Sequence, residues 1–188
     1  MKHLNRKLKI ALEDISDGKI RDEKEIVIYA RLKNLDDLIK SDHTFEDHEQ
    51  WSIKTEKGII RCRKTTNKNE ITYIQTVKGN TDRKDTKEEV SFPVTQGVFE
   101  LIRKISQSGM IKRRYIILKD GLTYEYDLFV KGQDQYQPWI KIDIETDKDL
   151  DIDFSKLPIE VEEAVIQDDK NKTLISKIYS ENFIIINT

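Results

Sequence analysis

The sequence predicts an α+β fold that is mainly β and is built on an antiparallel sheet of about eight strands. Three observations lead to this prediction. Apolar and polar residues alternate in about eight segments, which is the period of a strand with one buried face. The connections between these segments are short, as in hairpins, and leave no room for the crossover helices of a parallel sheet. Helical spacing occurs only in brief stretches between them.

The elements follow one another in a regular order. Apolar residues at helical spacing predict a short N-terminal helix over 4–16, which Asp17 and Gly18 end. The sheet region, over about 20–170, contains strands predicted from alternation at 23–32, 58–64, 70–78, 88–94, 110–118, 122–130, 139–145 and 159–166. Helical spacing predicts short helices at 34–41 and 95–106 and a C-terminal helix at about 173–180.

Length and charge limit the organisation and the partners of the chain. We expect one domain over residues 1–188, because no Pro- or Gly-rich linker divides it. Lys and Arg number 33 against 35 Asp and Glu, a net charge of −2, so no overall positive field attracts duplex nucleic acid. The apolar runs are shorter than the roughly 18 residues that span a membrane. A single cysteine, Cys62, and the lack of a signal-peptide pattern predict a cytoplasmic protein, whose oligomeric state the sequence leaves open.

The polar faces of the predicted strands carry charges in an unusual order. Cations, or a cation with a hydroxyl, recur at a spacing of two in three strands, and acids do so in three others. The cationic set is Arg61, Arg63, Thr76, Lys78, Lys112 and Arg114, and the acidic set is Glu23, Glu25, Glu125, Asp127, Asp143 and Glu145. One interpretation is a set of solvated faces whose like charges avoid one another across strands. The other is a closed barrel with a charged, wet interior.

The second interpretation predicts a particular ligand. A polyphosphate needs several fixed cations, and planar Arg side chains hold phosphate oxygens in a bidentate way. Acidic residues would repel this anion unless a hard metal ion lay between them, and Mg²⁺ or Mn²⁺ takes oxygen ligands from carboxylates, phosphate and water. Cations and carboxylates in one cavity therefore indicate a polyphosphate bridged by a divalent metal.

Along the chain, these motifs stand in the order of a known family. They are Glu23-x-Glu25, Arg61-x-Arg63, Thr76-Val77-Lys78, Lys112-x-Arg114, Glu125-Tyr126-Asp127-x-Phe129, Asp143-x-Glu145, and Leu157-Pro158 followed by Glu163-Ala164-Val165. The series, over roughly residues 20–180, resembles the CYTH superfamily, the triphosphate tunnel metalloenzymes. Each motif alone is common, whereas the ordered series is hard to obtain by chance.

The resemblance implies an eight-stranded antiparallel β-barrel that forms a tunnel and acts on a triphosphate-containing substrate with Mg²⁺ or Mn²⁺. It implies phosphate binding by Arg61, Arg63, Lys78, Lys112 and Arg114. It implies metal binding, directly or through water, by Glu23, Glu25, Asp143 and Glu145. The candidate catalytic residues, which would orient the attacking water, are Glu23, Glu25 and Glu163. Asp127 matches an acid that supports the site by orienting neighbouring cations.

Some positions depart from the family's pattern. The first motif, ExExK, ends here in Val27, so one phosphate-facing lysine is absent. Arg31, four residues further along the same strand face, is the candidate substitute. Asp143 stands where the family usually has Glu, and Ala164-Val165 replaces the usual Val-Thr.

Several functions are compatible with these residues. The leading hypothesis is a metal-dependent hydrolase of a linear triphosphate, either inorganic triphosphate or a nucleoside or other organic triphosphate. An RNA 5′-triphosphate end stays a candidate as well, because the assigned residues contact only the shared triphosphate. The alternatives are a degenerate, non-catalytic protein that binds a nucleotide or polyphosphate, a member of the adenylate cyclase type, and a structural domain with solvated charges.

Two other features have simpler explanations. Segment 42–49 contains two histidines and four acids, but the histidines are five residues apart, and we expect a solvated acidic loop rather than a metal site. Trp51 would pack this loop on the sheet. Cys62 lies between Arg61 and Arg63 and so faces the opposite, helix-covered side, where we expect it to act as a small buried hydrophobic residue.

Overall fold

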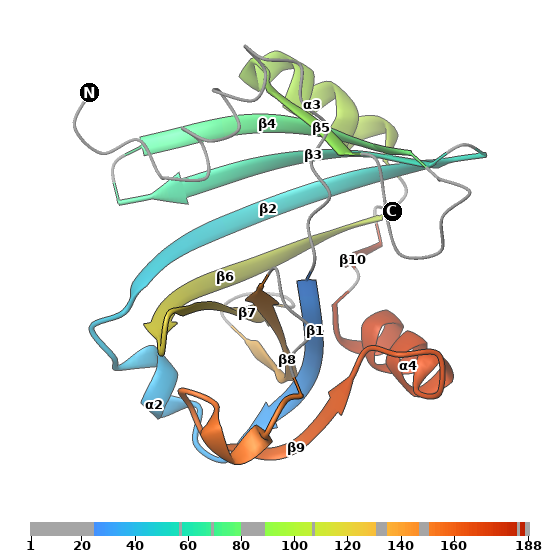
Figure 1. The fold of residues 1–188 in the computed structure, drawn as a ribbon. Coiled ribbons are helices and arrows are strands. Elements are labelled where there is room, and N and C mark those ends of the chain that lie inside the picture. Colours follow the sequence, from blue (N-terminus) through green and yellow to red (C-terminus); the bar gives the residue numbers. More distant parts are fainter. Residues whose placement is uncertain are drawn as a thin grey trace.

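The computed structural model describes residues 25–56, 58–68, 70–79, 89–106, 108–130, 135–146, 151–183 and 185–186. The predicted helix over 4–16 and the candidate residue Glu23 lie outside these residues. Within them the fold is mainly β, as the alternation predicts, with a few helices placed against one sheet (Figure 1).

The strands match the predicted alternation, with two additions. They are β1 (Glu25–Leu32), β2 (Thr44–Thr55), β3 (Gly58–Asn67), β4 (Glu70–Gly79), β5 (Glu89–Pro93), β6 (Ser108–Lys119), β7 (Leu122–Val130), β8 (Tyr136–Glu145), β9 (Val161–Ile166) and β10 (Ile185–Ile186). The predicted strands are confirmed to within a few residues at their described ends. β2 and β10 are the additions.

β2 lies where we expected a solvated acidic loop, and that prediction is wrong. The side chains of Glu46, His48 and Gln50, at alternate positions of this strand, are buried. These buried positions carry polar residues where an ordinary strand would carry apolar ones. The segment therefore lacks the alternation of a strand, and its sequence is like that of a loop. β2 is a central strand, since it pairs with β3 on one side and with β6 on the other.

The strands form one antiparallel sheet in the order β5-β4-β3-β2-β6-β7-β8-β1-β9, with β10 paired to β6. The sheet is strongly curved (Figure 1). β5 and β9 are its edges, and within the described ranges no pairing joins them. This open sheet of ten strands differs from the predicted closed barrel of eight. The edge strands are short, five residues in β5 and six in β9, so direct pairing between them would form few hydrogen bonds.

The helices lie on opposite faces of the sheet. The predicted helices correspond to α2 (Asp36–Ile39), α3 (Gln96–Ile105) and α4 (Lys172–Asn182), and η1 (Phe154–Lys156) is a short 3₁₀ turn. α3 packs on the outside of β2, β3 and β4, at the top of Figure 1. α4 packs on the other face, against residues of β1, β6 and β7.

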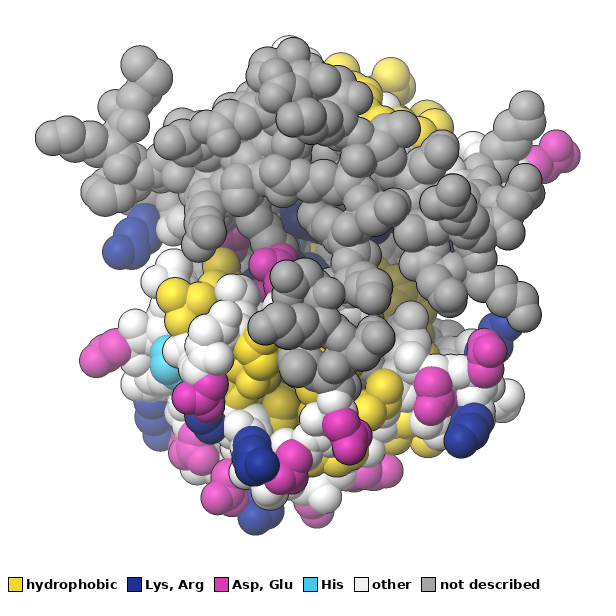
Figure 2. All heavy atoms as spheres, in the orientation of Figure 1, with side chains coloured by type: hydrophobic (Ala, Val, Ile, Leu, Met, Phe, Trp, Pro, Cys, Tyr) yellow, Lys and Arg dark blue, Asp and Glu magenta, His cyan; other side chains and the backbone are white. Residues whose placement is uncertain are grey.

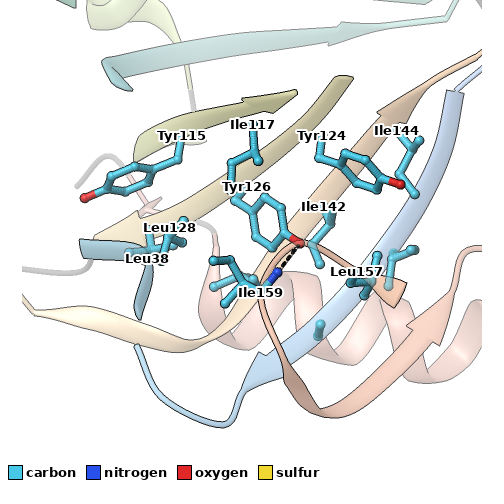
Figure 3. Packing of buried hydrophobic residues seen from close by; sticks show 13 residues of the cluster. Leu38, Tyr115, Ile117, Tyr124, Tyr126, Leu128, Ile142, Ile144, Leu157 and Ile159 are labelled. Atoms are coloured by element: carbon cyan, nitrogen blue, oxygen red, sulfur yellow. Dashed lines mark hydrogen bonds between the residues drawn. The ribbon is translucent and has the colours of Figure 1, made fainter. Parts of the chain in front are cut away.

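The main core lies on the apolar face of the sheet, which we define by alternate residues such as Ile28, Tyr126 and Ile142. These three side chains have no exposed surface. Leu38 of α2 and the segment that follows η1 cover them (Figure 3). Side chains stand on alternate faces of a strand, so a buried apolar face leaves the intervening residues on the opposite face.

Cys62 lies on this apolar face as predicted. It is fully buried and packs with Trp51 and with Phe99 of α3. Burial raises the pKa of the Cys62 thiol. The expectation of a small buried hydrophobic residue is confirmed. Trp51 belongs to β2 itself, so the prediction that it packs a loop on the sheet is wrong.

The hydroxyl of Tyr126 offers a test of this core. It accepts a hydrogen bond from the backbone N–H of Ile159 at 3.3 Å, which joins β7 to the segment before β9 (Figure 3). We expect Tyr126→Phe to lower the free energy of unfolding by about 1 kcal/mol, because the buried N–H loses its acceptor. Tyr124→Phe is the matched control, since Tyr124 lies on the same strand and its hydroxyl has no hydrogen bond among the described residues. Equal urea midpoints for the two variants would contradict this role.

The described part of the side drawn in Figure 2 has no surface patch made up of positive charges alone or of negative charges alone. Lys and Arg side chains are interspersed there with Asp and Glu. Among the described residues, no helix has both the length and the apolar character that a membrane crossing requires.

Candidate functional site

The charged face of the sheet, defined by residues opposite in phase to the apolar face, carries the candidate site. Arg61 of β3 lies opposite Thr76 of β4, and Arg114 of β6 lies between Glu46 of β2 and Asp127 of β7. All described candidate residues share this face: Glu25, Arg31, Arg61, Arg63, Lys78, Lys112, Arg114, Asp127, Asp143, Glu145 and Glu163. Residues that are spaced two apart in the sequence therefore lie together on one face of the folded sheet.

Arg114 is at the centre of this surface and is held by three carboxylates. Its Nε donates to Asp127 Oδ1 at 2.6 Å and its Nη2 to Asp127 Oδ2 at 2.7 Å. Nη1 donates to Glu125, and Nη2 also reaches Asp143 Oδ2 at 3.1 Å. Burial disfavours the charged guanidinium, but these carboxylates hold the pKa of Arg114 well above its ordinary value.

Two lysines complete the buried ion pairs. Lys112 pairs with Asp127, and Lys141 Nζ lies 2.5 Å from Asp143 Oδ1. Burial, followed by the charge of Arg114, lowers the pKa of Lys112 to about 7. Burial alone would raise the pKa of Asp127, but Arg114 and Lys112 hold it well below the ordinary value. The cations of β6 and β8 are thus neutralised largely within the protein.

The arginines of β3 are in a different position. Arg61 Nη2 donates to Thr76 Oγ1 at 3.3 Å, and Thr76 is hydrogen bonded to Ser91 at 2.9 Å. Arg63 forms no ion pair with the described residues, and its buried Nε has no hydrogen-bond partner among them. Burial and the charges of Arg61 and Arg114 lower the pKa of Arg63 to about 9. Arg63 is therefore a half-buried cation that has no carboxylate partner among the described residues.

A carboxylate pair lies at the other side of the charged face. Glu25 of β1 is the register partner of Glu145 of β8, and Asp143 is two residues from Glu145 on the same face. Burial, with the charges of Asp127 and Glu25, raises the pKa of Asp143 against the opposing effect of Lys141. A cation bound beside these acids would reduce their mutual repulsion.

The donor set fits a hard divalent ion, although the described residues contain no group of three or more His, Cys, Asp or Glu arranged to hold a metal. Mg²⁺ is commonly bound by only one or two carboxylates, with phosphate and water as its other ligands. Glu25 and Glu145 supply such a pair of oxygen ligands. Asp143 is a weaker candidate than predicted, because Lys141 and Arg114 already engage its carboxylate.

Three predicted residues lie apart from the cluster around Arg114. Arg31 faces Glu163 across β1 and β9, near one edge of the sheet, and both residues are exposed. Arg31 also lies 3.8 Å from Glu162. Lys78 is near the end of β4, opposite Ile59. These positions lie on β1, β4 and β9, away from the ion pairs of β6, β7 and β8, so the roles of these three residues stay predictions.

Sequence reasoning gave no site role to four buried polar residues of the charged face and to one half-buried lysine: Glu46, His48, Gln50, Glu125 and Lys141. Lys141 had a signal, because it alternates with isoleucines in the same segment as Asp143 and Glu145. Glu46, His48 and Gln50 also stand at a spacing of two, but no apolar alternation marks their strand. Only the pairing of β2 with β3 and β6 reveals them.

Val27, at the position of the absent lysine, lies under α4. It is buried with Ile175, Ile178 and Phe183 in one apolar cluster. Phe183 stacks on Phe129 with ring centroids 3.7 Å apart. A lysine at position 27 would place its stem in this cluster, so the apolar side chain here matches the helix that covers it.

The comparisons with known proteins give a fold. No protein-family profile matches the chain, and no curated protein matches its sequence. The solved structure of the inorganic triphosphatase NE1496 superposes with a TM-score of 0.51 at 20% identity, over 84% of this chain and 96% of that one. Another structure of NE1496, described as a hypothetical protein, gives 0.49 at 20% identity, over 81% and 96%. The PH1819 protein from Pyrococcus horikoshii OT3 gives 0.46 at 15% identity, over 88% and 95%.

The chain and the inorganic triphosphatase NE1496 thus share a fold over nearly the whole of that protein. The identity is low, so the similarity concerns the arrangement of strands. The resemblance expected from the order of the charged motifs is confirmed at the level of the fold.

Proposed function

We propose that this chain binds a triphosphate-containing small molecule on its charged face and hydrolyses the terminal phosphoanhydride with Mg²⁺ or Mn²⁺. The observation that carries the proposal is Arg63, a half-buried arginine whose buried Nε has no hydrogen-bond partner and whose guanidinium has no carboxylate partner among the described residues. Leaving such a charge buried is costly unless an anion enters and accepts its hydrogen bonds. A phosphate group matches the planar fork of an arginine, and Arg61 lies beside it on the same face.

The two sides of the charged face would take different parts of the ligand. Arg61 and Arg63 would hold phosphate oxygens and fix the chain, with Lys112 as a further donor once the anion competes for it. Arg114 would act mainly as an anchor, because three carboxylates already fix its guanidinium. Held in this way, the terminal phosphate is oriented for in-line attack.

Glu25 and Glu145 would hold the divalent ion, with Asp143 in support. When bound, such an ion supplies charge neutralisation and Lewis acidity at the phosphate oxygens. Glu25 would orient the attacking water and accept its proton. The oxygen of the water forms a bond to the terminal phosphorus and the bond to the bridging oxygen breaks. The bridging oxygen leaves with the diphosphate part of the substrate, and orthophosphate is the other product. We also propose that the charged face lines a tunnel, as the resemblance implies.

The proposal predicts metal-dependent release of orthophosphate from inorganic triphosphate. Release should stop with a chelator and return with Mg²⁺ or Mn²⁺, because those ions suit carboxylate and phosphate oxygens. Parallel assays with ATP separate the reactions, since hydrolysis yields orthophosphate and cyclisation yields pyrophosphate. A protein that neither binds nor hydrolyses any triphosphate with either ion would contradict the proposal.

Binding without turnover is the second candidate function, and Val27 favours it. Val27 packs against α4 at the position where the first motif would carry a lysine, so the charged face has one phosphate-binding cation fewer there. In this case calorimetry detects binding of inorganic triphosphate, while the phosphate-release assay stays at background. Both functions use Arg63 in the same way.

A further inference from the structure

His48 is a buried polar side chain of the charged face to which the proposed reaction gives no role. Only 2% of its surface is exposed. It lies on β2 between Thr65 of β3 and Lys112 of β6, so its ring is next to the cationic strands. Its Nε2 is 3.1 Å from Glu46 Oε2. Its Nδ1 is buried and has no hydrogen-bond partner among the described residues.

The contact with Glu46 fixes the tautomer of the neutral ring. A carboxylate accepts hydrogen bonds, so the proton of neutral His48 lies on Nε2 and the lone pair lies on Nδ1. A lone pair is a poor neighbour for a phosphate oxygen, which needs a donor. The same nitrogen becomes a donor when it takes up a proton.

The surroundings of His48 decide when that proton is bound. Burial, followed by the charges of Arg63, Lys112 and Arg114, lowers its pKa well below 6.5, and Asp127 opposes them weakly. Glu46 also lies beside the ring and favours the charged form. His48 is therefore neutral at neutral pH without a ligand. A bound polyphosphate would offset the three cations that keep it so.

We propose that His48 takes up one proton from solvent when a polyphosphate enters the charged face, and that Nδ1–H then donates to a phosphate oxygen. The proposal rests on the proposed function, because the anion must bind beside Arg63. The new N–H bond forms on Nδ1, and the proton comes from the buffer. His48 thereby adds a donor that exists only in the complex, and the affinity for a polyphosphate falls as the pH rises.

Calorimetry measures this proton directly. The probe is imidotriphosphate, in which NH groups replace the bridging oxygens, with Mg²⁺ at pH 7 in two buffers of different ionisation enthalpy. We expect the wild type to take up nearly one proton more per bound ligand than His48→Gln. His43→Gln is the matched control, because His43 precedes β2 and lies outside the charged face, and it should match the wild type. Protons exchanged by the ligand and metal cancel between the variants.

¹⁵N spectra of the wild type make the test independent of how the variant folds. The chain has three histidines, so their ring signals are few. On addition of the probe, the His48 nitrogens should move from the positions of a neutral tautomer to those of an imidazolium. Binding with His48 still neutral, and with equal proton uptake in His48→Gln, would overturn this proposal and leave the proposed function intact. No binding by the wild type would overturn both.

Discussion

Replacing Arg114 with Ala should lower the free energy of unfolding by about 3–5 kcal/mol, because it leaves buried carboxylates without their counter-ion. Arg114 donates to Glu125, Asp127 and Asp143, each of which is at most 1% exposed. Lys112 and Lys141 would still pair with two of these carboxylates, but Glu125 would lose its ion pair with Arg114. Urea denaturation at pH 7 measures the loss, which should be accompanied by loss of phosphate release.

The control for Arg114 is its neighbour Arg113, which lies on the opposite face of β6. Its Nε lies 2.7 Å from Asp47 Oδ1 in a partly exposed pair, so Arg113→Ala should cost about 1 kcal/mol or less. Equal losses in the two variants would show that the carboxylates do not depend on Arg114.

The cost of Arg114→Ala should depend on pH in a definite direction. In the wild type the pKa of Asp127 is held well below its ordinary value, so its stabilising effect is complete at neutral pH and is lost as the pH falls through that low pKa. Without Arg114 the buried acids favour protonation, and their pKa values rise. The difference in the free energy of unfolding between the wild type and Arg114→Ala should therefore be largest near pH 7 and should decrease toward pH 4. A gap that stays constant over this range would contradict the ion-pair explanation.

Replacing Arg63 with Gln should reduce kcat/KM for inorganic triphosphate roughly a hundredfold or more, because the ligand loses a buried charged donor. The free energy of unfolding should not fall, since the lost cation has no carboxylate partner among the described residues. Arg63→Gln should thus lower the activity and leave the stability unchanged, whereas Arg114→Ala should lower both. Phosphate release and urea denaturation of the same preparation measure both quantities.

Lys64→Gln is the matched control for Arg63. Lys64 is the next residue on β3 and lies on the opposite face, with Glu49 and Tyr73 as its register partners on the neighbouring strands. The substitution removes the same charge as Arg63→Gln. It should keep the activity of the wild type. Equal activity in Arg63→Gln and Lys64→Gln would remove β3 from the site.

The strands of this fold could be predicted because most of them bury an apolar face. Ile140, Ile142 and Ile144 of β8 alternate with charged residues, and the structure has the strand where the pattern puts it. β2 could not be found in this way. Its buried positions hold Glu46 and His48, and polar residues in a buried row cancel the alternation on which the prediction depends.

The site could be predicted only in part, because spacing tells which residues share a face and not which residues meet. Arg114 and Asp127 face each other across β6 and β7, in register set by a tight hairpin at Asp120 and Gly121. Arg114 is also hydrogen bonded to Asp143 of β8, however, and this contact depends on the pairing of β7 with β8. The contacts of Val27 depend on α4, which is distant in the sequence.

The shared face of the candidate residues has a consequence for insertions and deletions. Side chains alternate with a period of two, so a change of one residue within a strand turns everything on one side of it to the other face. Loss of Cys62 alone would make Arg61 and Arg63 adjacent, and one of them would point into the apolar core. Added or lost residues between strands leave the faces unchanged. Chains that keep this chemistry are therefore free to vary the lengths of their loops, while an odd number of residues has to separate the charged positions within each strand.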